Sequence, residues 1–248
     1  QITTESKNVC DLILSIYKDF GFENVRINYS DRPKKRVGSD DIWDKAEKAL
    51  MDAAEATGLK YSLNSGDGAF YGPKLDFILR DAIGRDWQCG TLQVDFNMPG
   101  RLGASYIGED NSKHIPVMLH RAILGSLERF MGILIEHYEG RFPSWLSPIQ
   151  VAVTTIVSEV EDYSNKIEEE FRNKGIRTII DTRNEKINYK IREHSHNKVP
   201  FILVIGKKEK ENNTVALRRL GSSDQEILHS NDCLKKIINE TIPPDLEE

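Results

Sequence analysis

The sequence is poor in the features that mark secreted and membrane proteins. Its 248 residues include three widely spaced cysteines, Cys10, Cys89 and Cys233. An odd number of distant cysteines argues against a disulfide framework and suits a reducing, cytoplasmic compartment. No apolar run approaches the roughly 18 residues that span a bilayer, and the N-terminus lacks a basic segment followed by an apolar core. We therefore expect neither a signal peptide nor a membrane partner.

Positive charge is also scarce in the chain as a whole. Lys and Arg number 34 against 39 Asp and Glu, which gives a formal net charge of -5. This balance argues against nucleic-acid binding through bulk positive charge, although a local basic face could still bind. Residues 183–198 and 207–219 each hold five basic side chains against two acidic ones. Two such segments in an acidic chain are the local footprint that a phosphate backbone requires.

A connector with two prolines divides the sequence. Residues 140–148 contain Pro143 and Pro148, which end a preceding helix and stiffen the chain. We therefore expect one domain over residues 1–142 and a second over residues 143–248.

The first domain is expected to combine helices with antiparallel strands. Periodicity predicts helices over residues 4–20, 40–58 and 125–138, and strands over 24–29, 75–79, 92–96 and 114–120. The turn at 82–85 joins two of these strands as antiparallel neighbours. The second helix would bury Ile42, Ala46, Ala49, Leu50 and Ala53, and the third Leu127, Phe130, Leu134 and Tyr138. This combination indicates an α+β domain.

The second domain alternates strands with helices. Strands are expected over residues 149–157, 177–181, 201–206 and 214–220, and helices over 160–174, 187–196 and 232–239. Alternation of this kind predicts an α/β domain with a mixed, mainly parallel sheet covered by helices.

Two polar segments of the first domain could carry chemistry. Residues 66–74 bend tightly at glycines and a proline, and Tyr71 and Lys74 project from the bend; alone, the segment is also typical of a hairpin edge. In residues 117–130 a strand leads into a helix, whose N-terminus favours anions and whose Arg129 could grip a phosphate in two places. The alternative is that Arg129 only pairs with Glu128 or with another surface acid.

A third polar segment carries two amide side chains. Gln88 and Gln93 lie five residues apart, so a regular strand would turn them to opposite faces. They share a face only if a bulge intervenes, and Cys89-Gly90 is the place for it. Amide groups suit recognition of an amino acid and a nucleotide, but they are equally ordinary on a solvent face.

These segments together resemble one family. Gly-Ser-Leu-Glu-Arg-Phe at residues 125–130 is similar to motif 3 of class II aminoacyl-tRNA synthetases. With the segments at 68–74, 88–96 and 117–122, it resembles the threonyl-tRNA synthetases in particular. The resemblance implies ATP- and Mg²⁺-dependent activation of L-threonine and its transfer to the 3′ end of threonine tRNA. It implies a class II catalytic core followed by an anticodon-binding domain.

The same resemblance implies roles for single residues. Arg129 would be catalytic and hold the ATP γ-phosphate, in a nucleotide site lined by Gln88, Thr91 and Ser126. Contacts to threonine would come from Tyr71, Lys74 and Gln93. His120 matches one ligand of the family's Zn²⁺.

Several family elements are expected to be missing from these 248 residues. The other two zinc ligands lie upstream of the residue that matches Gln1, so zinc is expected to bind weakly or not at all. Motif 1, through which the family forms homodimers, and motif 2, which supplies arginines to ATP and tRNA, are also absent. We expect these residues alone to be unable to activate threonine.

The second domain resembles the anticodon-binding domain of several class II synthetases, through residues 181–187, 190–193 and 199–201. The match gives as base readers Asn184, Arg192, Glu209 and Arg218, with Arg183 and Lys186 nearby. The alternative is a solvated basic face without specificity. For the whole chain, the alternatives are a prolyl, histidyl or glycyl synthetase, or a non-catalytic RNA-binding module derived from a synthetase.

Overall fold

The computed structural model describes residues 1–58 and 60–246, and it divides into two compact units, Gln1–His137 and Tyr138–Glu248. No helix within those described ranges is long and apolar enough to cross a membrane. All three cysteines are buried free thiols, so the prediction that they form no disulfide framework is confirmed.

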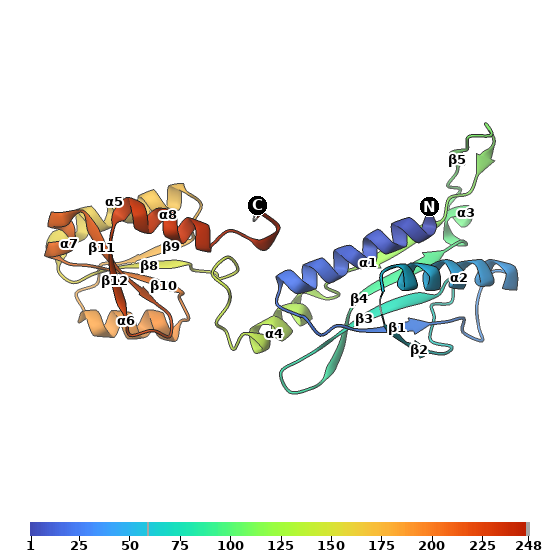
Figure 1. Ribbon diagram of the computed structural model, residues 1–248, viewed down its shortest axis with the longest axis horizontal. Coiled ribbons are helices and arrows are strands. Elements are labelled where there is room, and N and C mark those ends of the chain that lie inside the picture. The colour runs from blue at the N-terminus through green and yellow to red at the C-terminus, as the bar shows by residue number, and fades with distance from the viewer. Residues whose placement is uncertain (59, 247–248) are drawn as a thin grey trace. The chain divides into compact units, whose positions relative to one another are not determined.

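The first unit is the expected α+β domain. Its main strands are β1 (Arg26–Ser30), β2 (Tyr61–Asn64), β3 (Lys74–Arg80), β4 (Asp86–Asp95) and β7 (Met118–Ala122), and its helices are α1 (Ile2–Asp19), α2 (Asp40–Ala56), α3 (Met98–Arg101) and α4 (Leu127–His137). The sheet has the order β2-β1-β3-β4-β7, in which β1 and β2 are parallel and the other pairs antiparallel. Helices α1 and α2 lie together along this sheet (Figure 1).

Glycines end both covering helices. Gly21 follows α1 with φ of 81°, and Gly58 follows α2 with φ of 69°. A left-handed backbone of this kind is available to glycine without steric cost, so both helices end where the sequence predicts. Beneath them Tyr17 and Trp43 are buried against the sheet's apolar side. This leaves the opposite side of β3 and β4 to polar residues.

Two predicted helix faces need correction. In α2 the buried set includes Trp43 and Ala54, while Ile42 and Ala49 are half-buried, because the covered stripe is rotated toward Trp43. In α4 the core side is Phe130, Ile133 and Leu134. Leu127 is 66% exposed, and with Met131 and Ile135 it forms a separate stripe on the helix surface. Tyr138 is half-buried and follows the helix end.

The strand expected over residues 114–120 is two separate strands. β6 (Lys113–His114) pairs with β5 (Tyr106–Ile107) in a small hairpin, and β7 joins the main sheet beside β4. Pro116 lies between them and has no N–H to donate to a ladder, which explains the break.

The second unit has the expected mixed sheet. Its strands are β8 (Val151–Thr155), β9 (Thr178–Asp181), β10 (Phe201–Ile205), β11 (Thr214–Arg219) and β12 (Gln225–His229), in the order β12-β11-β10-β8-β9. β10, β8 and β9 are parallel, whereas β10–β11 and β11–β12 are antiparallel. Its helices are α5 (Glu161–Asn173), α6 (Ile187–His196), α7 (Lys207–Asn212) and α8 (Ser230–Glu240), with short 3₁₀ turns η1 (Ser158–Val160) and η2 (Pro244–Leu246).

Helices pack against both faces of this second sheet. Ile167 and Phe171 of α5 and Ile237 of α8 pack into the core on one face. Ile187 and Ile191 of α6 pack against the opposite face, and Figure 1 shows α6 across the sheet from α5 and α8. Helices thus pack on both faces around β8 and β10, whereas the edge strand β12 keeps Gln225, Ile227 and His229 exposed.

Candidate active site and anticodon-binding surface

A bulge in β4 turns the two predicted glutamines to one side. Phe77 of β3 pairs with Gly90, and the next residue, Ile78, pairs with Gln88, so Cys89 is the extra residue. A single inserted residue reverses the alternation of side chains beyond it. Gln88 therefore projects from the same face as Gln93, and the predicted bulge at Cys89-Gly90 is confirmed.

The centre of this polar face is the carboxylate of Asp76. Lys74 Nζ lies 2.8 Å from it, Gln88 Nε2 donates to it at 2.7 Å, and Thr91 Oγ1 donates at 3.1 Å. Gln88 also donates to Thr91 Oγ1 at 2.9 Å. Burial lowers the pKa of Lys74, but the carboxylates of Asp76 and Asp67 outweigh it and raise that pKa. Lys74, Gln88 and Thr91, all predicted site residues, thus form one cluster.

A second cluster lies around Gln93, two residues beyond Thr91 on β4. The Tyr71 hydroxyl donates to Gln93 Oε1, and Gln93 stands opposite His120 on β7. The rings of Tyr71 and His120 are 5.2 Å apart at an interplanar angle of 50°. Burial, followed by the charge of Asp95, raises the pKa of the Tyr71 hydroxyl. The two residues expected to contact threonine here are therefore next to the expected zinc ligand.

The metal environment of His120 is incomplete among these residues. Its Nε2 lies 2.9 Å from Asp95 Oδ2. Across residues 1–58 and 60–246, no three His, Cys, Asp or Glu side chains are grouped to hold a metal ion. Catalytic zinc needs three protein ligands and an open position. His120 and Asp95 alone do not fit that requirement, and no chemical step is assigned to zinc.

Arg129 meets β4 at the backbone rather than at the polar side chains. Its Nη1 donates to the Gln88 carbonyl at 3.4 Å, and its guanidinium lies 5.5 Å from the Trp87 ring centroid. Because Trp87 alternates with Gln88, that ring projects from the other face of the strand. The alternative pairing with Glu128 is not observed, since the Glu128 carboxylate accepts a bond from Ser126 Oγ at 2.7 Å.

Ser126 has a local role at the start of α4. Its backbone carbonyl accepts from Phe130 N at 3.0 Å, and its hydroxyl accepts from Arg129 N at 3.4 Å, as a helix cap does. The preceding Gly125 has φ of 66°, and a Cβ there would lie 3.1 Å from the Cys89 carbonyl oxygen. Glycine thus lets the α4 entry approach the bulge of β4.

Three side chains that organise the site are absent from the sequence prediction. They are Asp76 and Asp95, which anchor the two clusters, and Trp87, which lies under Arg129. Asp76 lies between Leu75 and Phe77 and Asp95 between Val94 and Phe96, and both aspartates are at most 4% exposed. A carboxylate between two apolar strand residues is the signal that could have revealed them, because a buried charge must be paired.

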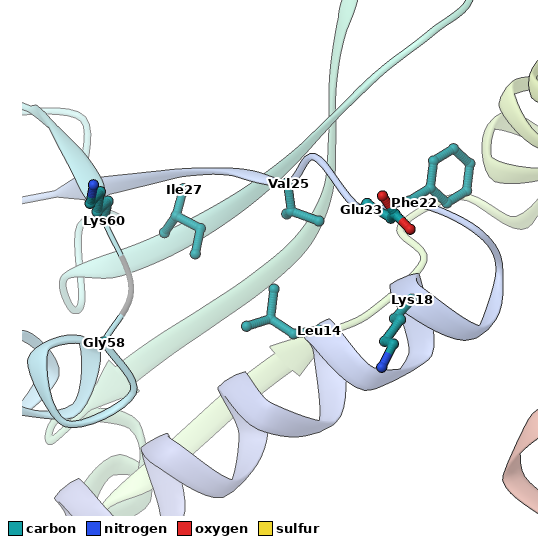
Figure 2. A pocket seen from close by; sticks show the side chains of 8 residues that line it. All are labelled: Leu14, Lys18, Phe22, Glu23, Val25, Ile27, Gly58 and Lys60. Carbon is teal, nitrogen blue, oxygen red and sulfur yellow. The ribbon is translucent and has the colours of Figure 1, made fainter.

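The first unit also has a pocket of about 490 Å³ away from these clusters. Figure 2 shows its lining, which comes from Leu14 and Lys18 of α1, from the segment leading into β1, and from Lys60. None of the predicted site residues lines it. The polar face of β3 and β4 therefore remains the candidate active site.

In the second unit, the predicted anticodon residues occupy several elements. Asn184 and Lys186 are exposed in the loop between β9 and α6, and Arg192 is exposed on α6. Arg218 on β11 is opposite Ile202, so it projects from the sheet face that α6 covers. One carboxylate oxygen of Glu209 already has a partner, because Oε2 accepts a hydrogen bond from Gly206 N at 2.9 Å at the start of α7.

Arg183 is held by two carboxylates. Its Nη2 lies 2.7 Å from Asp181 and 3.1 Å from Glu193, and Asp181 also lies 2.9 Å from His194 Nε2. The guanidinium of Arg183 lowers the pKa of Asp181 despite the opposing effect of burial. Burial also lowers the pKa of Lys190, whose ammonium donates to the Thr155 carbonyl at 2.9 Å. Arg183 therefore braces the loop that carries Asn184 and Lys186.

Family models match both units. A tRNA synthetase class II core domain (G, H, P, S and T) matches residues 1–138, and an anticodon binding domain matches residues 150–240. Among solved structures, the RNA binding domain of threonyl-tRNA synthetase from Cryptosporidium parvum has a TM-score of 0.94 and 37% identity, covering 100% of this chain and 62% of that chain.

Curated relatives match the whole chain. A threonine–tRNA ligase of Rhodospirillum rubrum is 59% identical over 246 residues, which are 99% of this chain and 38% of that protein. Another, of Ehrlichia chaffeensis, is 56% identical over 238 residues, 96% of this chain and 38% of that protein. This chain thus spans about two fifths of its relatives' length. The chain belongs to the class II tRNA synthetases, and throughout its length it is similar to the threonine–tRNA ligases.

Proposed function

We propose that this chain supplies half of the active site and the anticodon-binding domain of a threonine–tRNA ligase. The observation that supports it most is the bulge at Cys89, which turns Gln88 to the same face as Gln93. The full protein would activate L-threonine with Mg²⁺-ATP, transfer it to threonine tRNA in the cytoplasm, and act as a homodimer.

The chemistry follows from what the polar face offers. Gln88 and Thr91 would line the nucleotide site. The Arg129 guanidinium, whose Nη1 donates to the Gln88 backbone carbonyl, carries donors in a planar fork that suit a phosphate. Ser126 starts the helix that delivers Arg129. Tyr71, Gln93 and Lys74 would contact threonine. Adenylate formation depends mainly on positioning and charge neutralisation, and these polar groups supply both.

For anticodon binding, the loop after β9 is the strongest support. Arg183 ties this loop to Asp181 and Glu193, and the loop exposes Asn184 and Lys186. A braced loop loses little entropy when it binds unstacked bases. We propose that Asn184, Arg192, Glu209 and Arg218 read the anticodon.

Exchange of pyrophosphate into ATP by the full-length protein tests the activity. We expect exchange that depends on threonine and is lost at least tenfold in Gln93→Ala. Exchange with proline, histidine or glycine would instead favour another class II synthetase. No amino-acid-dependent exchange, with intact stem-loop binding, would leave the RNA-binding module as the better account.

The anticodon assignment is tested on this chain itself. A stem-loop with the threonine anticodon should bind more tightly than stem-loops with other anticodons at two salt concentrations. Arg218→Ala should weaken it by about 1–3 kcal/mol. Equal, salt-sensitive binding of every stem-loop would contradict the assignment and indicate a generic basic face.

A further inference from the structure

Asp76 is a buried carboxylate within β3. It is 4% exposed and lies between Leu75 and Phe77, which are both fully buried. Burying a carboxylate costs free energy unless hydrogen bonds or opposite charges compensate it. An apolar side chain would pack at this position without that cost, so the partners of Asp76 should explain its presence.

These partners include the hydrogen-bond donors of two predicted nucleotide-binding residues. Oδ1 of Asp76 accepts from Gln88 Nε2 at 2.7 Å and from Thr91 Oγ1 at 3.1 Å. The second proton of the Gln88 amide is donated to Thr91 Oγ1 at 2.9 Å. Because a carboxylate can only accept, Asp76 fixes the Gln88 amide with Nε2 turned inward, and it fixes the direction of the Thr91 hydroxyl.

The atoms that remain for a ligand are acceptors. Gln88 is exposed, and within residues 1–58 and 60–246 no group donates to its Oε1. Thr91 Oγ1 donates to Asp76 and accepts from Gln88, so it keeps one further lone pair. Neither side chain has a donor left for a phosphate oxygen, whereas both can accept from a hydroxyl or amino group.

The charges around Asp76 favour the same kind of ligand. Lys74 Nζ lies 2.8 Å from Asp76 and 3.2 Å from Asp67. Two carboxylates against one ammonium leave this cluster with one surplus negative charge, which repels a phosphate. A phosphate group is therefore disfavoured beside Asp76, and a neutral donor group is not.

We infer that Asp76 is a positioning residue of the nucleotide site, because it turns the donors of Gln88 and Thr91 inward and leaves their acceptors to bind a donor group of the nucleotide. That group is a ribose hydroxyl or the amino group of adenine, and not a phosphate. The inference rests on the proposed function for the identity of the nucleotide, but not for the arrangement of the hydrogen bonds.

The hydrogen bonds can be measured on this chain without nucleotide. Both Nε2 protons of Gln88 are bonded, so they should exchange with water about tenfold more slowly than those of the exposed Gln225. Gln88→Glu identifies the Gln88 signals in ¹⁵N NMR spectra. Exchange as fast as that of Gln225 would overturn the inference.

The chain offers a matched control for a kinetic test. Asp67 also contacts Lys74, but it is 58% exposed and its other partner is Asn64, whose Nδ2 donates to it at 3.0 Å. Asp67→Ala therefore removes a carboxylate from Lys74 without freeing the donors of Gln88 and Thr91. Asp76→Ala removes a carboxylate from Lys74 and frees both.

Threonine-dependent pyrophosphate exchange by the full-length protein is compared for ATP, 2′-deoxy-ATP, 3′-deoxy-ATP and the triphosphate of purine riboside, which lacks the amino group. Wild type should use one of these analogues with a kcat/KM about tenfold below that of ATP, because one donor is missing. That analogue identifies the bound group. Asp76→Ala should reduce the discrimination to less than about threefold, and Asp67→Ala should leave it unchanged.

A merely structural role of Asp76 predicts a different pattern. Asp76→Ala would then lower kcat/KM for ATP and for every analogue by the same factor, which would contradict the inference. Equal use of ATP and all three analogues by wild type would contradict it too. If wild type shows no threonine-dependent exchange, the proposed function fails, while water exchange of the Gln88 amide still decides the role of Asp76. The same measurement decides it if Asp76→Ala does not fold.

Discussion

Each unit of this chain buries an aspartate that lies 2.9 Å from a histidine nitrogen, yet the two pairs have different surroundings. His120 beside Asp95 keeps 36% of its side chain exposed, on the polar face of β4 and β7. His194 beside Asp181 keeps 7%, and Arg183 and Lys190 surround the same carboxylate. The same pair is therefore partly exposed in one unit and enclosed in the other.

The sheets explain that difference. In the first unit helices are packed on the apolar side of the sheet, and carboxylates on the other side hold polar groups in place. In the second unit the Asp181 carboxylate, at the end of β9, is enclosed by Arg183 and by Lys190 and His194 of α6. The groups packed around each pair, rather than the residue types in it, decide how much of the histidine stays exposed.

The largest expected effect is in the enclosed pair. Asp181→Asn removes the charge partner of the buried Lys190 and one of the two carboxylates that hold Arg183, so the free energy of unfolding should fall by about 3–5 kcal/mol. Urea denaturation measures this. The exposed Asp224→Asn should change stability by less than about 0.5 kcal/mol. If the two variants were equally stable, the Asp181 network would not brace the second unit.

The next effect tests the corrected face of α4. Leu134 is 6% exposed and Leu127 is 66% exposed. Leu134→Ala should therefore cost about 2–5 kcal/mol of unfolding free energy, whereas Leu127→Ala should cost less than about 0.5 kcal/mol. A similar cost for both substitutions would show that Leu127 is buried in solution, as the sequence alone predicts.

A third comparison separates side chains that stabilise the second unit from side chains that contact the anticodon. Arg192 is exposed on α6, so Arg192→Ala should weaken binding of the threonine anticodon stem-loop by about 1–3 kcal/mol and leave stability unchanged. Arg183→Ala should lower stability as well, because it removes the bonds to Asp181 and Glu193. If Arg183→Ala weakened stem-loop binding without lowering stability, Arg183 would contact the anticodon rather than stabilise the loop.

The smallest effect is a pH dependence at the turn between β3 and β4. Although burial opposes it, hydrogen bonds from Trp87 and Arg85 lower the pKa of Asp81 to about 2. In the unfolded chain the pKa of an aspartate is about 3.9. The stability that Asp81 adds is therefore present above that pH and is lost as the pH falls toward 2. Between those values Asp81→Asn should lose less stability than the wild type in acid denaturation. A steeper loss in the variant would contradict this assignment.

Much of the fold followed from local signals. Gly21 and Gly58 end helices as predicted, and the bulge lies at Cys89-Gly90, the place predicted for it if Gln88 and Gln93 were to share a face. β2 and β12 went unpredicted, because Tyr-Ser-Leu-Asn and Gln-Glu-Ile-Leu-His lie on edge strands that bury little. β2 pairs with β1, which is distant in the sequence, and β12 pairs with β11 at the edge of an existing sheet. Neither pairing is visible in the strand's own residues.

The candidate site was predictable in its polar side chains but not in its supports. Tyr71 and Gln93 could be chosen from their segments, whereas Asp76 and Asp95 acquire their roles only when β3, β4 and β7 align. The contact of Arg129 with Trp87 likewise depends on how α4 approaches β4. Such contacts join residues that are far apart in sequence, and no local pattern encodes them.

The most direct test of the account is an NMR titration of this chain with Mg²⁺-ATP. If the polar face of β3 and β4, together with Arg129 at the start of α4, is the nucleotide half of the site, the largest shift changes should centre on Gln88, Thr91 and Arg129. Shift changes centred instead on Lys18 and Lys60, in the pocket of Figure 2, would contradict the central claim, as would their absence from the polar face.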